Sequence, residues 1–286
     1  MKIYLKDIKE RYPEFEIRNY DEESFFVGFN HDSRCLIKNE IYVPIRGERF
    51  DGHDFIVEAL EKGASMSICE KNSSEKISGV SKPIILVDSI EEGLQKIVNF
   101  AISDITAPII AITGSTGKTT TKQMLAAILG FKNSVLYADH FNTVWGNAML
   151  LSRYENEDFV ILECAMDRKG EIAWHANTFN PDLGIILNIG HVHAEKIGSI
   201  EEIYEEKKNL ADYLDRAGKP LIINIDDERL RKLKDTFKSE LLTYGKSDDA
   251  MFKIYDITLT DTGTDFNFGF INSWYTVHIN AFGEGM

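Results

Sequence analysis

The sequence has few cysteines, no long apolar run and no excess of basic residues. Its three cysteines, Cys35, Cys69 and Cys164, are scattered and lack the spacing of metal ligands, which is typical of a reducing compartment. No apolar stretch approaches the length of a membrane span, and the first residues have no uninterrupted apolar core like that of a secretory signal. We therefore expect a cytoplasmic protein that does not insert into a membrane.

Basic residues are outnumbered by acidic residues. The chain has 32 Lys and Arg against 46 Asp and Glu, a formal net charge of −14. This balance argues against nucleic acid or an anionic membrane as the main partner. It does not exclude nucleotides, because a small local site can hold phosphates inside an acidic protein. With 286 residues, 43% hydrophobic and 27% charged, the chain is globular and long enough for two domains.

The first hundred residues form an alternating unit of strands and helices. The residue patterns predict strands at 41–46, 65–70 and 83–88, and helices at 53–63 and 89–104. Ser89 with Glu92 three residues later fits a capping box for the second helix. We assign residues 1–100 to a small N-terminal α/β domain. The chain shows neither internal repeats nor a low-complexity linker.

From Ala107 onward strands and helices alternate strictly. Strands are predicted at 107–113, 159–165, 183–189 and 220–225, and helices at 119–130, 170–179, 199–218 and 226–237. Near-continuous Ile, Leu and Val strands between helices indicate a parallel sheet covered on both faces. After Gly245, residues 251–260, 264–271 and 274–282 alternate with a period of two, which predicts an attached antiparallel β section. The fold class is therefore α/β, with a second domain at 101–286.

A candidate phosphate-binding loop joins a predicted strand to a predicted helix. It reads Gly114-Ser115-Thr116-Gly117-Lys118-Thr119. Glycines let backbone N–H groups turn toward phosphates, and the helix N-terminus adds partial positive charge. Lys118 would reach the terminal phosphates and the Thr119 hydroxyl would bind Mg²⁺. The alternative is a glycine-rich turn with an exposed lysine, since Ile112 stands where the common motif has its first glycine.

The sequence also bears on which nucleotide would bind. A GTP switch protein needs an Asn-Lys-x-Asp segment after a later strand. This chain has Asn224-Ile225-Asp226-Asp227 at that place, without a lysine. Guanine specificity is therefore not expected.

Polar residues follow the carboxyl ends of three predicted strands, where open α/β sheets bind ligands. Glu163 ends an apolar strand, where a carboxylate is costly unless it meets a metal or a partner. We favour Mg²⁺ ligation for Glu163 over an ion pair. His193 follows another strand and is favoured as a ligand, whereas His191 is expected to be an ordinary loop histidine.

Lys207 lies on the apolar stripe of the long helix predicted at 199–218. It is four residues after Ile203 and three before Leu210. On the pattern alone, we favour a lysine at the edge of the stripe that extends its ammonium group to water. The alternative is a lysine of lowered pKa that reacts with CO₂, giving a carbamate able to bind a second Mg²⁺. Ser199 with Glu202 fits a capping box at the start of this helix.

Several motifs, and the order in which they follow one another along the chain, resemble those of the Mur ligases. These are the ATP-dependent amide-bond-forming enzymes of peptidoglycan (cell wall) biosynthesis. ITGSTGKTTTK resembles their phosphate loop, and NIGHVHAEKIGS resembles the segment with their metal-binding histidine. The motifs DSR at 32–34 and GERFDGHDF at 47–55 resemble the UDP-sugar-binding domain. ECAMDRKGEI at 163–172 is most similar to the D-alanyl-D-alanine-adding type, MurF.

The resemblance implies a set of site residues. ATP would contact Gly114, Ser115, Thr116, Gly117, Lys118, Thr119 and Thr120, with Asn224 and Asp227 near the adenosine. Thr119 and Glu163 would bind one Mg²⁺, and His193 with carbamoylated Lys207 a second, so that Lys118, His193 and Lys207 are the catalytic residues. The UDP-muramoyl-peptide would contact Asp32, Ser33, Arg34, Phe50, Asp51, Gly52, His53 and Asn142. Arg34 would pair with phosphate, and Asp51 has the alternative role of a helix cap.

The implied activity is ATP-dependent addition of D-alanyl-D-alanine to a UDP-N-acetylmuramoyl-tripeptide through an acyl phosphate, by a monomer. The segment 139–148 departs from the usual pattern of this type and keeps only Asn142 and Gly146. One alternative is therefore a related ligase with a different carboxylate and amine pair. Another is a nucleotide-binding protein without ligase turnover, because we expect the chain to be truncated at Met286 and to lack the family's C-terminal domain.

Overall fold

The chain is described here from a computed structural model, which covers residues 1–47, 49–190, 197–270 and 273–280. Contacts divide it into two compact units. Unit 1 consists of Met1–Thr106 and Val144–Asn156, and unit 2 of Ala107–Thr143 and Glu157–Met286. Unit 1 therefore includes a segment that lies well beyond residue 100 in the sequence. The UDP-sugar and ATP roles assigned to the two domains stay predictions.

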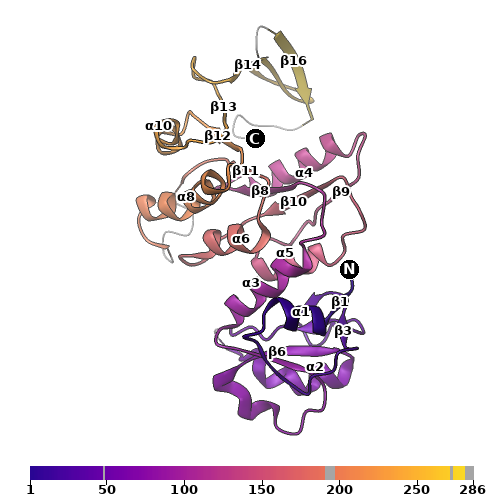
Figure 1. Ribbon diagram of the computed structural model, residues 1–286. Coiled ribbons are helices and arrows are strands. Elements are labelled where there is room, and N and C mark those ends of the chain that lie inside the picture. The colour runs from indigo at the N-terminus through magenta and orange to yellow at the C-terminus, as the bar shows by residue number, and fades with distance from the viewer. Residues whose placement is uncertain (48, 191–196, 271–272, 281–286) are drawn as a thin grey trace. The chain divides into compact units, whose positions relative to one another are not determined.

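Unit 1 is built around a five-stranded mixed sheet with the order β2-β7-β6-β5-β4. Figure 1 labels the strand β6 of this sheet. Its strands are β2 (Glu16–Arg18), β4 (Phe29–Asn30), β5 (Ile41–Tyr42), β6 (Met66–Glu70) and β7 (Ile84–Val87); β1 (Ile3–Tyr4) and β3 (Phe25–Phe26) form a separate antiparallel pair. Its helices are α1 (Leu5–Arg11), η1 (Gly52–Phe55), α2 (Ile56–Lys62), η2 (Lys71–Ile77), α3 (Ile90–Ala101) and α5 (Val144–Leu151). Buried apolar side chains of β5, β6, β7 and α2 form a common core.

Two expectations for unit 1 need correction. The strand predicted at 41–46 is only Ile41–Tyr42, because Pro44 has no N–H for a sheet and the chain turns so that Gly52 N–H donates to the Ile45 carbonyl. Ser89 is the N-cap residue of α3, but its side chain makes no capping hydrogen bond, so the predicted capping box is wrong.

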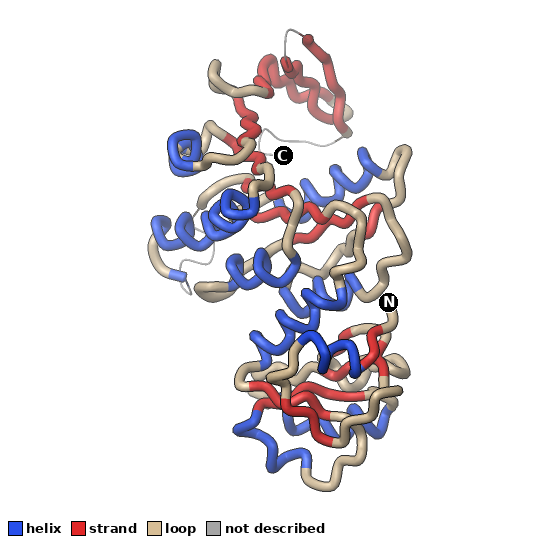
Figure 2. The backbone as a smooth tube through the Cα atoms, in the orientation of Figure 1, coloured by secondary structure: helices blue, strands red, loops and turns tan. Residues whose placement is uncertain are grey.

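Unit 2 contains one nine-stranded sheet with the order β16-β15-β14-β13-β12-β11-β8-β10-β9. Strands β8 to β14 pair in parallel and β14 to β16 pair antiparallel, which confirms the predicted α/β fold with an antiparallel section. The strands are β8 (Ile109–Thr113), β9 (Val135–Leu136), β10 (Phe159–Glu163), β11 (Leu183–Ile186), β12 (Leu221–Asn224), β13 (Leu241–Gly245), β14 (Phe252–Thr260), β15 (Gly263–Phe270) and β16 (Ser273–Ile279). Figure 2 shows strands alternating with helices along the tube of this unit.

Helices pack on both faces of the parallel part of this sheet. Ile185 of β11 belongs to a core cluster with Ala126 of α4 (Lys118–Leu129). Its neighbour Gly184 faces Leu214 of α8 (Ile200–Ala217). Because successive residues of a strand point to opposite faces, α4 and α8 cover opposite faces of the sheet.

The other helices in the described residues of unit 2 are short. They are α6 (Glu171–Phe179), α9 (Glu228–Arg231) and α10 (Leu233–Thr236). The single helix predicted at 226–237 is thus divided in two, and β13 was not predicted because its residues show no apolar alternation. The capping box of Ser199 and Glu202 at the start of α8 is confirmed. No helix in the described part of the chain is both long and apolar enough to span a membrane.

Candidate functional site

The candidate phosphate loop lies between the carboxyl end of β8 and the first turn of α4, as predicted. Gly117 is the N-cap of α4 and has a left-handed backbone with φ of 81°, which favours glycine. A Cβ atom on Gly114 would lie 2.9 Å from Cβ of Leu187, so close approach of the next strand requires glycine there as well. The two glycines therefore fix the shape of the loop.

The segment after β11 holds the loop through a set of hydrogen bonds. Asn188 accepts a hydrogen bond from Thr116 N–H with Oδ1 at 3.0 Å, and donates from Nδ2 to the Thr116 carbonyl at 3.2 Å. Ser115 Oγ accepts from Gly190 N–H at 2.7 Å and donates to the Gly190 carbonyl at 3.0 Å. The loop is therefore held by the neighbouring strand end. The sequence patterns did not indicate this pairing.

Lys118 lies over the same loop. Its Nζ donates to the Gly114 carbonyl at 2.8 Å. Burial lowers the pKa of this amine, and the negative charge of Glu163 opposes the shift. An ammonium group at a helix N-terminus and a glycine loop is the arrangement expected for a bound phosphate.

Glu163, at the end of β10, meets two groups of α4. Its Oε2 accepts a hydrogen bond from Thr119 Oγ1 at 2.9 Å and forms an ion pair with Lys122 Nζ at 2.8 Å. The structure thus brings together Thr119 and Glu163, which the sequence selected as Mg²⁺ ligands. It also shows the ion pair that was the alternative for Glu163. Lys122 was missed, although its position three residues after Thr119 places both on one helix face.

Lys207 is buried in α8, with only 3% of its surface exposed. The favoured interpretation of a lysine that reaches water is therefore wrong. Its Nζ lies 3.7 Å from Sδ of Met166. Burial and the positive charge of Lys118 lower the pKa of Lys207 to about 8, against a smaller opposing effect of Glu206.

Other parts of the predicted metal site are not tested. His193 lies outside the described residues, as does His191. Among the residues that the structure describes, no three His, Cys, Asp or Glu side chains gather as a metal site. The second Mg²⁺ and the carbamate stay predictions.

A cavity of about 460 Å³ opens beside the phosphate loop in unit 2. Its lining includes the loop and helix residues Ser115, Thr116, Gly117 and Thr120. It also includes larger side chains of β13 and the antiparallel section, namely Tyr244, Ile254, Ile257 and Phe266. A lining that combines a phosphate loop with apolar and aromatic side chains suits a nucleotide with its base.

The two residues predicted near the adenosine differ in their surroundings. Asn224 lines the cavity. Asp227 instead caps α9, accepting from Arg229 N–H at 2.9 Å and Leu230 N–H at 3.2 Å through Oδ1. Its Oδ2 accepts from Ile189 N–H at 2.7 Å. The Asp227 carboxylate therefore binds backbone groups.

Asn142 lies at a junction of loops in unit 2. Its carbonyl accepts a hydrogen bond from Ala165 N–H at 2.9 Å. The buried imidazole of His175 in α6 hydrogen-bonds to the backbones of the same two residues, and burial lowers the pKa of His175 to about 3. These contacts fix the backbone of the segment. The role of the Asn142 side chain in substrate binding stays a prediction.

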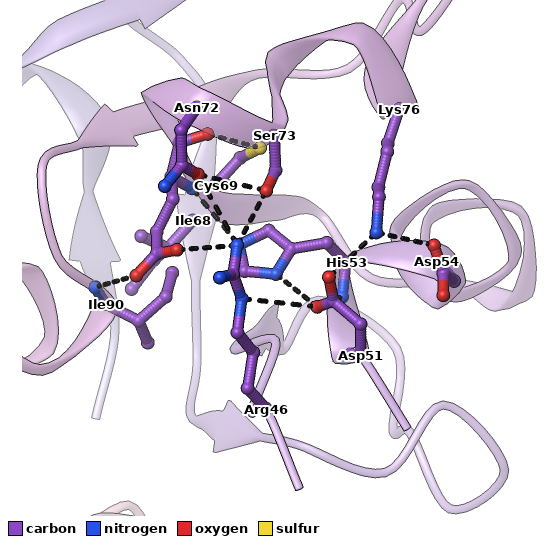
Figure 3. A network of polar contacts seen from close by, with 12 residues as sticks. Arg46, Asp51, His53, Asp54, Ile68, Cys69, Asn72, Ser73, Lys76 and Ile90 are labelled. Atoms are coloured by element: carbon purple, nitrogen blue, oxygen red, sulfur yellow. Dashed lines mark hydrogen bonds and ion pairs between the residues drawn. The ribbon is translucent and has the colours of Figure 1, made fainter. Parts of the chain in front are cut away.

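In unit 1, the predicted substrate residues Asp51 and His53 belong to a polar network (Figure 3). Asp51 Oδ1 accepts from His53 N–H at 3.1 Å, so its alternative role as the cap of η1 is confirmed. Figure 3 shows the Asp51 carboxylate between the side chains of His53 and Lys76. His53 is buried, with Nδ1 at 2.7 Å from Asp51 and Nε2 accepting from Glu70 N–H. Both ring nitrogens of His53 are thus used within the protein.

The other predicted substrate residues differ in exposure. Arg34 is exposed and pairs with Asp32 at 2.7 Å, which lowers the pKa of Asp32 to about 2. Ser33 is buried, and Phe50 is 69% exposed. A Cβ on Gly52 would lie 2.5 Å from the backbone nitrogen of Ile45, so Gly52 is required by packing. Binding of a UDP group by these residues stays a prediction.

Comparisons with known proteins agree with this architecture. Residues 112–286 match the model of the Mur ligase middle domain, and residues 26–101 match that of the Mur ligase family catalytic domain. The UDP-N-acetylmuramoyl-tripeptide–D-alanyl-D-alanine ligase of Bacillus subtilis is 32% identical over 260 residues, covering 90% of this chain and 56% of that protein. The Escherichia coli ligase of the same name is 28% identical over 239 residues, covering 82% and 52%.

Solved structures give the same result. The MurF ligase of Thermotoga maritima in complex with ADP matches with a TM-score of 0.77 and 31% identity over 88% of this chain and 57% of that chain. MurF from Acinetobacter baumannii has a TM-score of 0.86 at 20% identity over 100% and 62%, which supports the fold. The chain spans about half the length of the curated relatives it matches. Because a family model covers more than half of the sequence, the chain belongs to the Mur ligase family.

Proposed function

We propose that the chain is part of an ATP-dependent ligase that adds D-alanyl-D-alanine to a UDP-N-acetylmuramoyl-tripeptide in peptidoglycan precursor synthesis. The observation that carries this proposal is the phosphate loop. Its Thr119 hydroxyl donates a hydrogen bond to Glu163, and its residues line a cavity of nucleotide size. The proposal is further supported by relatives of that name at 32% and 28% identity and by a solved MurF structure in complex with ADP.

The proposed reaction has two steps. A carboxylate oxygen of the tripeptide attacks the γ-phosphorus of ATP, and the bond from that phosphorus to the bridging oxygen breaks, giving an acyl phosphate and ADP. The amine of D-alanyl-D-alanine then attacks the acyl carbon, loses a proton and displaces inorganic phosphate. Lys118 stabilises the charge on the transferring phosphoryl group, because its ammonium lies at the phosphate loop.

One Mg²⁺ fits the residues at the loop. The Thr119 hydroxyl and the Glu163 carboxylate are hard oxygen donors that already lie 2.9 Å apart, which is the chemistry Mg²⁺ prefers. When bound, Mg²⁺ would neutralise negative charge on the phosphates. A second Mg²⁺ at His193 and a carbamoylated Lys207 is a separate proposal, supported by the buried position and lowered pKa of Lys207.

The substrate contacts proposed for unit 1 are the exposed members of the predicted set. Arg34 and Phe50 have surface available for a UDP group, whereas His53 and Gly52 would support the loop from inside. A monomeric state and a cytoplasmic location complete the proposal.

The test is an amide-ligation assay on the full reading frame that contains this chain. Phosphate release from ATP is measured with UDP-muramoyl-tripeptide, D-alanyl-D-alanine and Mg²⁺, and the product is identified by mass spectrometry. We expect amine-dependent phosphate release and the amide product. Lys118→Met should abolish turnover, whereas Lys132→Met, at an exposed lysine beyond α4, should not change it.

The same assay separates the alternatives. Turnover with another amine or carboxylate, and none with this pair, would indicate a related ligase with different substrates, as the departures in 139–148 allow. ATP binding without amine-dependent phosphate release would indicate a nucleotide-binding protein. Failure to bind ATP would refute all three.

A further inference from the structure

We propose that Lys122 is a positioning residue that holds the Glu163 carboxylate toward the Mg²⁺ of bound ATP. This inference rests on the proposed function, because it assumes Mg·ATP at the phosphate loop. It adds a residue of α4 that is neither in the loop nor among the predicted ligands. Lys122 acts through Glu163 and is not expected to contact the reacting atoms.

Lys122 and Thr119 both contact the same carboxylate oxygen of Glu163. The two residues are three apart in α4, so they lie on one face of the helix. Oε2 of Glu163 lies 2.8 Å from Lys122 Nζ and 2.9 Å from Thr119 Oγ1. Two contacts to one oxygen limit rotation of the carboxylate and keep it beside the hydroxyl that would bind Mg²⁺.

Burial makes this pair costly. Lys122 is 1% exposed and Glu163 is 4% exposed, so both charges are removed from water. The desolvation cost of such a pair commonly offsets its attraction, and an apolar pair of similar volume is often as stable. Stability alone therefore gives a weak reason for two buried charges at the end of β10. A requirement to orient a metal ligand gives a stronger one.

Lys122 is itself held from a third direction. Its Nζ donates to the Asp139 carbonyl at 3.3 Å, in the segment that leads to Asn142. The ammonium group thus joins α4, the end of β10 and the loop after β9. A side chain tied to three elements is rigid enough to fix its partner.

The experiment measures how much Mg²⁺ improves ATP binding. Isothermal titration calorimetry gives the dissociation constant of ATP in EDTA and in excess Mg²⁺, and we define the ratio of the two as the Mg²⁺ advantage. Loss of a group that orients a metal ligand typically weakens metal binding by about 10-fold to 100-fold. We expect Lys122→Met to lower the Mg²⁺ advantage by about 10-fold, while ATP binding in EDTA changes less.

A double-mutant cycle with Glu163→Gln tests whether Lys122 acts through Glu163. In the Glu163→Gln background, Lys122→Met should leave the Mg²⁺ advantage unchanged. An equal effect in both backgrounds would overturn the proposal, as would an unchanged Mg²⁺ advantage with only a loss of stability. A rise in the advantage would also overturn it, because it would mean that Lys122 competes with the metal.

Two provisions keep the test decisive. If Lys122→Met does not fold, Lys122→Gln takes its place in the cycle, because the shorter, neutral amide removes the ammonium contact to Oε2. Lys122→Gln is then compared with the unmodified protein, and the Lys122→Gln, Glu163→Gln double variant, which removes both buried charges, is compared with Glu163→Gln. Absence of any Mg²⁺ advantage in the unmodified protein would instead refute the proposed function, so the two failures are distinguishable.

Discussion

Replacement of Glu206 should destabilise unit 2 more than replacement of any other Asp or Glu residue of α8. The Glu206 side chain is buried and binds the N-terminus of α6. Its Oε2 accepts from Gly170 N–H at 2.8 Å and its Oε1 accepts from Ile172 N–H at 2.9 Å. The first N–H groups of a helix have no partner within the helix, so Glu206 supplies partners that nothing else in α6 can.

The magnitude follows from these two bonds. A hydrogen bond to a charged group contributes about 1.5–3 kcal/mol net, and its loss leaves a buried N–H unsatisfied. Glu206→Ala removes both bonds, so we expect a loss of about 4 kcal/mol in the free energy of unfolding. Glu206→Gln retains one acceptor oxygen and turns an amide NH₂ toward the second N–H, so we expect a loss of about 2 kcal/mol.

Urea unfolding followed by circular dichroism measures these values. The matched control is Glu205→Ala at the preceding, exposed position, for which we expect a change within about 0.5 kcal/mol. A loss for Glu206→Ala within 1 kcal/mol of that control would refute this role of Glu206, since two buried charge-assisted hydrogen bonds cannot be so weak.

Three further predictions concern other parts of the molecule. The pKa of His175 is lowered to about 3, so the folded protein leaves this imidazole neutral above that pH, whereas the unfolded chain protonates it below about pH 6.5. The free energy of unfolding is therefore lost as pH falls from 6.5 to 3. In urea unfolding, His175→Gln should reduce the slope of stability against pH by about one proton, which is about 1.4 kcal/mol per pH unit between pH 6 and 4. Lys207→Ala should lose ligase activity and regain part of it with added short carboxylates if a carbamate is used, whereas no rescue at any concentration would exclude the carbamate. Gly52→Ala should lower the stability of unit 1 by about 2 kcal/mol or more in the same unfolding assay, because its Cβ would meet the Ile45 backbone at 2.5 Å; a neutral effect would contradict the packing role.

Much of the fold was predictable because its strands carry clear patterns, near-continuous apolar residues in the parallel part and alternation with a period of two in the antiparallel part. The run from Ile109 to Thr113 and the alternation from Phe252 to Ile279 gave their elements correctly. Short elements were not predictable. The two-residue strand β5 ends before Pro44, and the inclusion of Val144–Asn156 in unit 1 depends on contacts that no local pattern records.

The candidate site was predictable where a motif fixes the chemistry. The loop from Gly114 to Thr119 and the strand-end Glu163 could be selected from residue type and position alone. Pairwise contacts could not: Lys122 looks like any helical lysine until β10 is placed beside α4. Lys207 illustrates the opposite error, because helical periodicity locates a residue on a stripe without showing how deeply that stripe is buried.

The strand order of unit 2 has a consequence for how the protein folds. β8 lies between β10 and β11, so the contacts of its loop join residues that are 44 positions apart for Thr119 and Glu163 and 75 apart for Ser115 and Gly190. Closing such long stretches of chain is slow, and no local segment can assemble the loop environment early. The nucleotide site should therefore form only late in folding. A nucleotide present at that stage would bind only folded molecules and shift the equilibrium toward the folded state by mass action.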